Sequence, residues 1–159
     1  MKNTFTLFIA LAALAFVALA CNFSTANMSS FKTSKDKDGK QEASSFKGGD
    51  TLYANAVISN AGGKTTTRFY LVADDSPVAK KGETVKGSEV KVDLPSAGTA
   101  QYSLPIPDGV SGKFTLNAEM LDEKGEKKDS KSAPVSIEAS AAPASPADTT
   151  KSDKDDDDK

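Results

Sequence analysis

The most reactive side chain in this 159-residue sequence is the thiol of Cys21, the only cysteine. Cys21 follows an uninterrupted apolar run from Leu7 to Ala20, and Lys2 stands before that run. A positive charge followed by an apolar stretch is typical of a secretory signal peptide. The run of about fourteen residues is shorter than the roughly twenty that a membrane-spanning helix needs. We therefore predict that residues 1–20 form a signal helix that is cleaved from the mature protein.

Small apolar residues, Ala18-Leu19-Ala20, precede Cys21, and the polar Asn22 follows it. This junction resembles a bacterial lipobox. The resemblance implies cleavage between Ala20 and Cys21, with fatty acids such as palmitate carried on the Cys21 thiol and often on the new α-amino group. One acyl chain binds a membrane marginally, whereas two or more hold a protein stably. The alternative is an ordinary secretory signal with an Ala-x-Ala cut, which would leave Cys21 as a free thiol.

The rest of the chain lacks the side chains of the common catalytic centres. It contains no histidine, and lipidation of Cys21 would remove its only thiol. Ser-His-Asp triads, Cys-His pairs and imidazole or thiolate zinc sites are therefore excluded. A Ser-x-x-Lys spacing begins at Ser29, Ser34 and Ser44, but a chain this rich in serine and lysine produces the spacing by chance. We predict a protein that is not an enzyme.

Acidic residues are the remaining candidates for chemistry. An enzyme built on carboxylates alone, such as those of Glu83, Glu89 and Glu119, would need two of them about 5 to 9 Å apart in a cleft. The segment Asp36-Lys37-Asp38-Gly39 matches the middle of a calcium loop. However, Ser34 would be the first ligand, and Ser45 stands where the twelfth must be a glutamate. We therefore predict a solvated turn, with no metal and no cofactor.

The C-terminal stretch 139–159 has no apolar residue larger than alanine or proline. It cannot bury enough surface to offset the entropy of ordering, so we predict a disordered tail. Its last residues, Asp155–Asp158 and Lys159, resemble an enterokinase site, although a native acidic tail is the interpretation that we favour. The whole chain has 20 basic and 22 acidic side chains, and this balance offers no basic stripe for nucleic acid.

Between these ends, apolar and polar residues alternate with the period of a β-strand. Leu52, Ala54, Ala56 and Ile58 form the apolar face of one such segment. Proline residues in a later segment indicate that its far end lies at a sheet edge. The pattern predicts seven strands, around Phe31 and over 52–58, 65–73, 90–94, 100–106, 114–120 and 133–137.

Seven short strands separated by turns over about 110 residues are typical of a β-sandwich. The phrases FKGGDTLYANAVISN (46–60) and GKFTLNAEMLDEKGEKKDSKSAPVSI (112–137) resemble those of bacterial immunoglobulin-like or fibronectin-III-like modules. The immunoglobulin Cys–Trp–Cys signature is absent. We therefore predict an all-β protein with one seven-stranded immunoglobulin-like sandwich over 30–138, joined to the lipid by a tether over 21–29.

These features favour a non-catalytic interaction or structural module of the cell envelope, held at the membrane through Cys21, with an envelope protein or polysaccharide as partner. One alternative is a carbohydrate- or peptide-binding module, for which Tyr53, Phe69 and Tyr70 could form an aromatic platform. Another is a protease inhibitor that uses an extended loop, 74–81 or 105–111. Asn22 directly after the cysteine, by resemblance to Gram-negative sorting signals, favours the outer membrane over the inner one.

Overall fold

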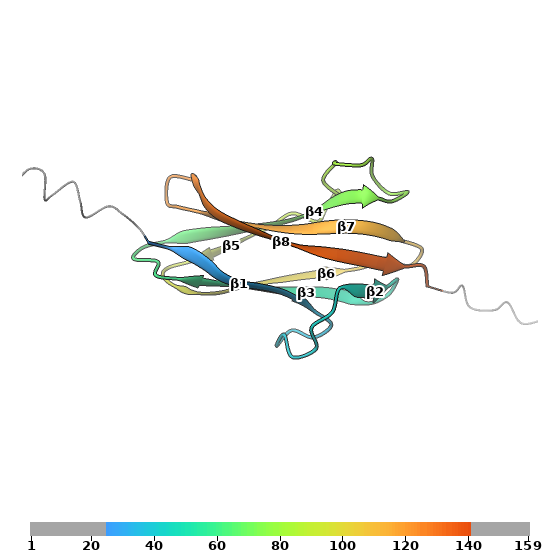
Figure 1. Ribbon diagram of the computed structural model, residues 1–159, viewed down its shortest axis with the longest axis horizontal. Helices are drawn as coiled ribbons and strands as arrows, with labels where there is room; N and C mark the ends of the chain where they lie inside the picture. The colour runs from blue at the N-terminus through green and yellow to red at the C-terminus, as the bar shows by residue number, and fades with distance from the viewer. Residues whose placement is uncertain (1–24, 141–159) are drawn as a thin grey trace, which may run out of the picture.

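The computed structural model describes residues 25–140 (Figure 1). The predicted signal helix, the cleavage site at Ala20, the lipidation site Cys21 and the predicted tail from residue 141 onwards lie outside the described residues. Within the described part of the chain, no helix is long and apolar enough to cross a membrane.

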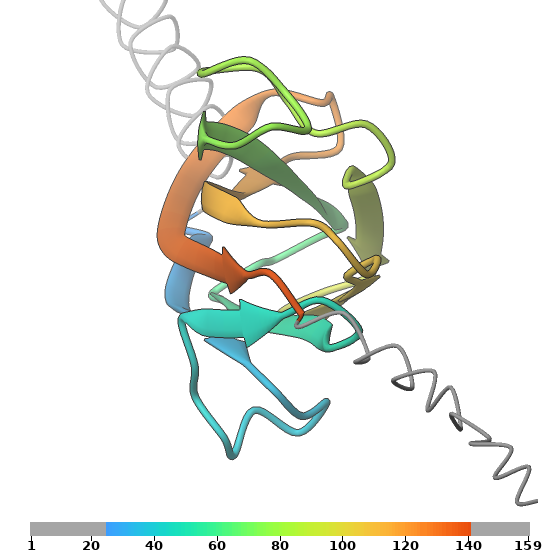
Figure 2. The ribbon, with the colours of Figure 1, turned by 90° about the vertical axis from the view of Figure 1, so that its right-hand side faces the viewer.

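The described residues form eight strands and no helix. The strands are β1 (Asn27–Ser34), β2 (Ser45–Lys47), β3 (Thr51–Ser59), β4 (Thr65–Asp75), β5 (Val90–Leu94), β6 (Gly98–Pro105), β7 (Gly112–Leu121) and β8 (Lys127–Glu138). A three-stranded sheet has the order β1-β3-β6, and a five-stranded sheet has the order β2-β8-β7-β4-β5. Neighbouring strands are antiparallel except β2 and β8. The two sheets pack face to face as two layers (Figure 2).

The core lies between the sheets and is filled by alternate residues of each strand. In β3 the four residues predicted to form the apolar face are at most 1% exposed. In β7 the alternation buries Phe114 and Leu116 in the same way. Phe69 of β4 and Tyr102 of β6 stack across the two layers with ring centroids 5.3 Å apart. The burial of alternate residues between two facing sheets confirms the predicted all-β, sandwich-like architecture.

The structure has one strand more than the seven predicted. The additional strand, β2, is only three residues long and pairs in parallel with the end of β8. Its single apolar side chain, Phe46, is 1% exposed. A three-residue segment with one apolar residue shows no alternation, so the pattern could not reveal it. The last strand also begins at Lys127 rather than at 133, because the exposed residues before Ala133 pair with β7.

The strands run along the long axis of the domain, so its two ends are built from different loops. At one end, β1 starts at Asn27 beside Ser59, and the turn between β7 and β8 lies nearby, since the backbone N–H of Met28 bonds to Asp129. At the other end, β8 stops at Glu138 (Figure 1). The connections from β4 to β5 and from β6 to β7 meet at this second end.

Candidate functional site

The serines of the Ser-x-x-Lys spacings take part in backbone hydrogen bonds. The hydroxyl of Ser29 donates to the carbonyl of Val57 at 3.2 Å, and that of Ser34 donates to the carbonyl of Asp36 at 2.7 Å. The carbonyl of Ser44 accepts a bond from the backbone N–H of Ser136 at 2.7 Å. The bonds of Ser29 and Ser44 join neighbouring segments, and that of Ser34 closes a local turn, so each serine has a structural role.

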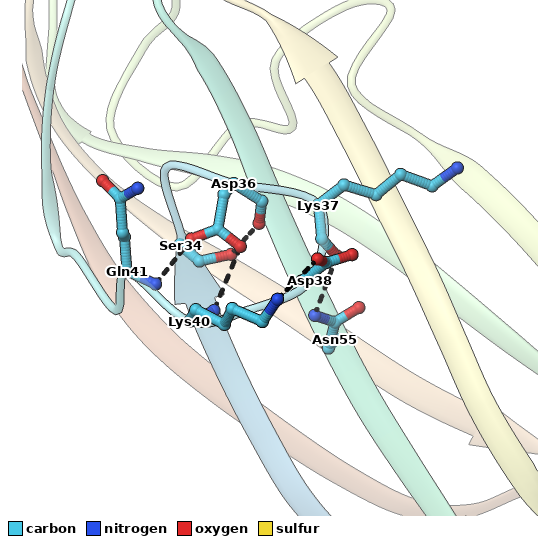
Figure 3. A network of polar contacts seen from close by, with 7 residues as sticks. All are labelled: Ser34, Asp36, Lys37, Asp38, Lys40, Gln41 and Asn55. Atoms are coloured by element: carbon cyan, nitrogen blue, oxygen red, sulfur yellow. Dashed lines mark hydrogen bonds and ion pairs between the residues drawn. The ribbon is translucent and has the colours of Figure 1, made fainter.

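Asp36 closes a turn with its own carboxylate (Figure 3). The carboxylate accepts hydrogen bonds from the backbone N–H groups of Lys40 and Gln41. The bond from Lys40, followed by the other turn amides, lowers the pKa of Asp36. Asp38 pairs instead with the Lys40 ammonium at 3.1 Å. Both Asp36 oxygens are engaged by the turn, and residues 25–140 contain no cluster of three or more Asp, Glu, His or Cys side chains that could hold a metal.

The three glutamates considered for acid-base chemistry each have a different local partner. Glu83 accepts a hydrogen bond from the backbone N–H of Lys80 at 3.2 Å, and Glu89 lies 3.8 Å from the Lys91 ammonium. Glu119 lies on the outer face of the five-stranded sheet, where the Arg68 guanidinium lies 2.7 Å from its carboxylate. Each of the three carboxylates therefore contacts a backbone N–H group or a basic side chain.

The proposed aromatic platform does not form. Phe69 is 0% exposed and packs in the core. Tyr53 lies on the outer face of the three-stranded sheet, since its neighbours Leu52 and Ala54 point inward. Tyr70 lies on the outer face of the other sheet. The three rings thus occupy the core and two opposite surfaces.

A cleft of about 580 Å³ lies at the end of the domain where β8 stops. We call it the loop cleft, because the β4–β5 and β6–β7 connections form its two sides. Its volume lies within the roughly 300 to 1,000 Å³ of typical ligand sites. The apolar residues that line it are Leu71, Val78, Ala79, Val85, Leu104, Pro105, Ile106, Pro107, Val110, Phe114 and Ile137.

Contacts at the base of the two connections hold the cleft together. The Ser76 hydroxyl donates to the carbonyl of Ser111 at 3.3 Å. Gly112 adopts φ +133°, and a Cβ there would lie 2.5 Å from the carbonyl oxygen of Asp75. Only glycine permits so close a backbone approach in this conformation. The two loops, which the sequence suggested separately as inhibitor loops, are therefore joined into one surface.

The outer wall of the cleft is fixed by backbone pairing with β4. The N–H of Ala73 donates to the carbonyl of Glu83 at 3.0 Å, and the N–H of Val85 donates to the carbonyl of Leu71 at 2.8 Å. The N–H of Gly82 donates to the carbonyl of Ala73 at 2.8 Å and that of Glu83 to the carbonyl of Lys80 at 2.9 Å, so the chain turns back on itself between Ala73 and Glu83.

Ser88 connects this wall to the opposite sheet. Its hydroxyl accepts the N–H of Leu71 at 3.0 Å and donates to the carbonyl of Val85 at 2.7 Å, while its own carbonyl accepts the Tyr102 hydroxyl at 2.9 Å. Burial raises the pKa of Tyr102, so the hydroxyl keeps its proton. No pattern in the sequence identified Ser88, because its partners are 3 to 17 residues away along the chain.

Apolar surface dominates the cleft, and its charged groups lie at the rim. Val78, 47% exposed, is the most exposed large apolar side chain among the described residues. Glu83 and Lys86 line the cleft with exposed side chains. Such a surface can bind an apolar group and hold it between the two loops.

A second hollow, of about 360 Å³, lies between β1 and β8. It is more open than the loop cleft and lies beside an ion pair between Lys32 and Glu42. This second hollow has less apolar surface than the loop cleft, so the loop cleft is the better candidate site.

Comparisons with known proteins give a structural similarity but no family. No family model matches the sequence, and no curated protein matches it. Among solved structures, the chain is similar to the soluble domain of PmoD from Methylocystis sp. strain Rockwell. The identity is 13%, the alignment covers 68% of this chain and 89% of that chain, and the TM-score is 0.40.

Proposed function

We propose that this protein is a lipid-anchored component of the bacterial cell envelope that binds a partner protein without catalysing a reaction. The observation that carries the proposal is the loop cleft, an apolar hollow whose two walls are tied together by the contact of Ser76 with Ser111. A pre-formed apolar hollow with few polar groups is the usual form of a binding site.

The positions of the anchor and the cleft suit this role. Cys21, the proposed lipid carrier, precedes the start of β1 at Asn27 by six residues, so a lipid on Cys21 would hold the β1 end of the domain near the membrane. β4 has eleven residues and so spans roughly 35 Å at about 3.3 Å per residue. The loop cleft, at the far end of β4, would face away from the membrane toward partners in the envelope.

The chemistry of the cleft favours a protein partner over a polysaccharide. Sugar rings commonly stack on exposed aromatic faces, and Tyr53 and Tyr70 lie on opposite surfaces of the domain, away from the cleft. Val78, Val85 and Leu104 instead offer aliphatic contacts, which suit the apolar side chains of a peptide. We also propose that the fold is related to immunoglobulin-like modules and that the lipid anchor lies in the outer rather than the inner membrane.

Site-specific photo-crosslinking in native membranes tests the proposal. A photo-crosslinking amino acid at Val78 reports on the rim of the cleft, and the same amino acid at Lys124 is the matched control, because Lys124 is exposed in the turn at the opposite end. We expect a discrete crosslinked protein from position 78 that is absent from position 124. Identical products from both positions, or none from position 78, would contradict the proposal.

A further inference from the structure

We propose that the partner binds as an extended peptide segment that adds a strand to the free edge of β6 and places a side chain in the loop cleft. This inference rests on the function proposed above and specifies how that site is used. Strand addition is a recurring mode of peptide recognition, in which backbone hydrogen bonds supply affinity and adjoining pockets supply specificity.

β6 is an outermost strand with unpaired backbone groups. It lies at the end of the three-stranded sheet, and among residues 25–140 it pairs only with β3. Ile106 donates its N–H to the carbonyl of Asp50 and accepts the N–H of Gly49, both at 2.9 Å, so its polar groups point toward β3. Backbone groups alternate sides along a strand. The pairing of β6 with β3 has no register shift, so every second residue before Ile106 also faces β3. The residues between them, Thr99, Gln101 and Ser103, direct their N–H and C=O groups to the free edge.

The free edge of β6 carries none of the charged side chains that protect the other sheet edges. Natural sheet edges carry charged side chains or proline that discourage pairing. The other three outermost strands have lysines: Lys32 in β1, Lys47 in β2 and Lys91 in β5. β6 has no charged residue over its eight positions. Its one proline, Pro105, stands at the end of the strand and blocks no donor between Gly98 and Leu104.

The edge leads directly into the loop cleft. Leu104, Pro105 and Ile106 are consecutive residues at the end of β6, and all three line the cleft. Since Pro105 has no N–H, the backbone hydrogen bonds between β6 and an added strand would end there. Past that point, the incoming segment has the aliphatic walls of the cleft beside it. The strand ladder and the pocket thus form one continuous surface.

The anchor argues against a second copy of this chain as the occupant. Two copies that pair β6 with β6 around a two-fold axis would have antiparallel strands and so would point in opposite directions. In each copy β1 starts at one end of the domain and β8 stops at the other (Figure 1), so the β1 starts of the two copies would lie at opposite ends of the dimer. Two chains lipidated at Cys21 in the same membrane cannot adopt that arrangement. A segment of a different protein meets no such restriction.

Proline substitution at the free edge tests this mode of binding in the membrane-anchored protein. Gln101→Pro removes an outward N–H and leaves the bonds to β3 in place, whereas Gln101→Ala keeps the N–H and removes only the side chain. With the photo-crosslinking amino acid at Val78 as reporter, we expect the crosslinked product to fall about ten-fold or more in Gln101→Pro, because a ladder bond is lost and the ring obstructs the incoming strand. Gln101→Ala should retain it.

The outcomes separate the two proposals. No crosslinked protein in the wild type would overturn the proposed function itself. Equal crosslinking in Gln101→Pro and Gln101→Ala would leave the cleft as a binding site but overturn strand addition, and a crosslinked homodimer would overturn the choice of partner.

Amide hydrogen exchange of the unsubstituted protein keeps the inference testable should Gln101→Pro fail to fold. The amides of Thr99, Gln101 and Ser103 should exchange at least ten-fold faster than those of Ala100 and Tyr102, which face β3. Equal protection of both sets would show that the edge is already covered and would overturn the inference.

Discussion

The hydroxyl of Ser76 donates a hydrogen bond to the carbonyl of Ser111 at 3.3 Å, across 35 residues of sequence. This contact joins the β4–β5 connection to the β6–β7 connection. It lies beside Gly112, whose backbone passes close to Asp75 and Ser76. The cleft is therefore a product of tertiary structure, assembled where two otherwise independent loops meet.

Gly112→Ala should destabilise the domain and disturb the cleft. A Cβ at Gly112 would lie 2.5 Å from the Asp75 carbonyl oxygen and 2.9 Å from the Ser76 Cα, and φ is +133°. Backbone atoms cannot yield as a flexible side chain can, so we expect a loss of about 1–3 kcal/mol in the free energy of unfolding. Urea denaturation measures this loss.

Gly62→Ala is the matched control for that substitution. A Cβ at Gly62 would meet nothing within 4 Å, and Gly62 is not among the glycines with positive φ. The change should alter the free energy of unfolding by no more than about 0.5 kcal/mol. Equal effects of the two substitutions would show that the close approach at Gly112 does not constrain the loops.

Ser88→Ala should loosen the wall of the cleft. The Ser88 side chain is buried and satisfies both the N–H of Leu71 and the carbonyl of Val85. Its removal leaves a buried donor without a partner, which costs about 1–3 kcal/mol. We expect that loss of stability together with faster amide exchange at Leu71. Ser96→Ala, at an exposed serine in the turn before β6, should change neither quantity.

The ion pair between Arg68 and Glu119 should make stability depend on pH. The two side chains lie 2.7 Å apart, and the Tyr70 hydroxyl donates to Glu119 at 3.1 Å. Burial alone would raise the pKa of Glu119, but the bonds from Arg68 and Tyr70 outweigh it and hold the pKa below its ordinary 4.5. A carboxyl with a lowered pKa stabilises the fold above its unfolded-state pKa, and this stabilisation is lost as pH falls through the folded-state pKa.

Glu119→Gln tests this dependence. We expect the variant to be less stable than the wild type by about 1–2 kcal/mol at pH 7, with the difference shrinking as pH falls below 4.5. Free energies of unfolding measured from pH 7 to pH 3 give the comparison. Glu126→Gln, in an exposed pair with Lys128, is the control and should have little effect. A constant difference across this range would show that the Glu119 charge contributes nothing.

The sequence predicted the parts of the fold that depend on local alternation. Leu52, Ala54, Ala56 and Ile58 were expected to face the core and do so, because side-chain direction in a strand is set by its own period of two. β2 could not be predicted in the same way. Phe46 is buried where β2 pairs with the end of β8, about ninety residues later in the chain, and the residues next to Phe46 show no pattern that indicates this pairing.

The candidate site was only partly visible in the sequence. The sequence offers the segments 74–81 and 105–111 as candidates for an extended inhibitor loop, but their contact depends on the close approach at Gly112. The role of Ser88 depends on Leu71, which is 17 residues earlier. Such pairings arise from sheet topology, so composition and spacing carry no signal for them.

Mass spectrometry of the N-terminal peptide of the membrane-purified protein tests the central claim most directly, since the proposed orientation of the cleft relative to the membrane depends on the proposed anchor at Cys21. We predict that the mature chain begins at Cys21 and carries diacylglycerol on its thiol, and that Cys21→Ala abolishes both the modification and the membrane association. A mature chain that begins at another residue, or at an unmodified Cys21, would contradict the account.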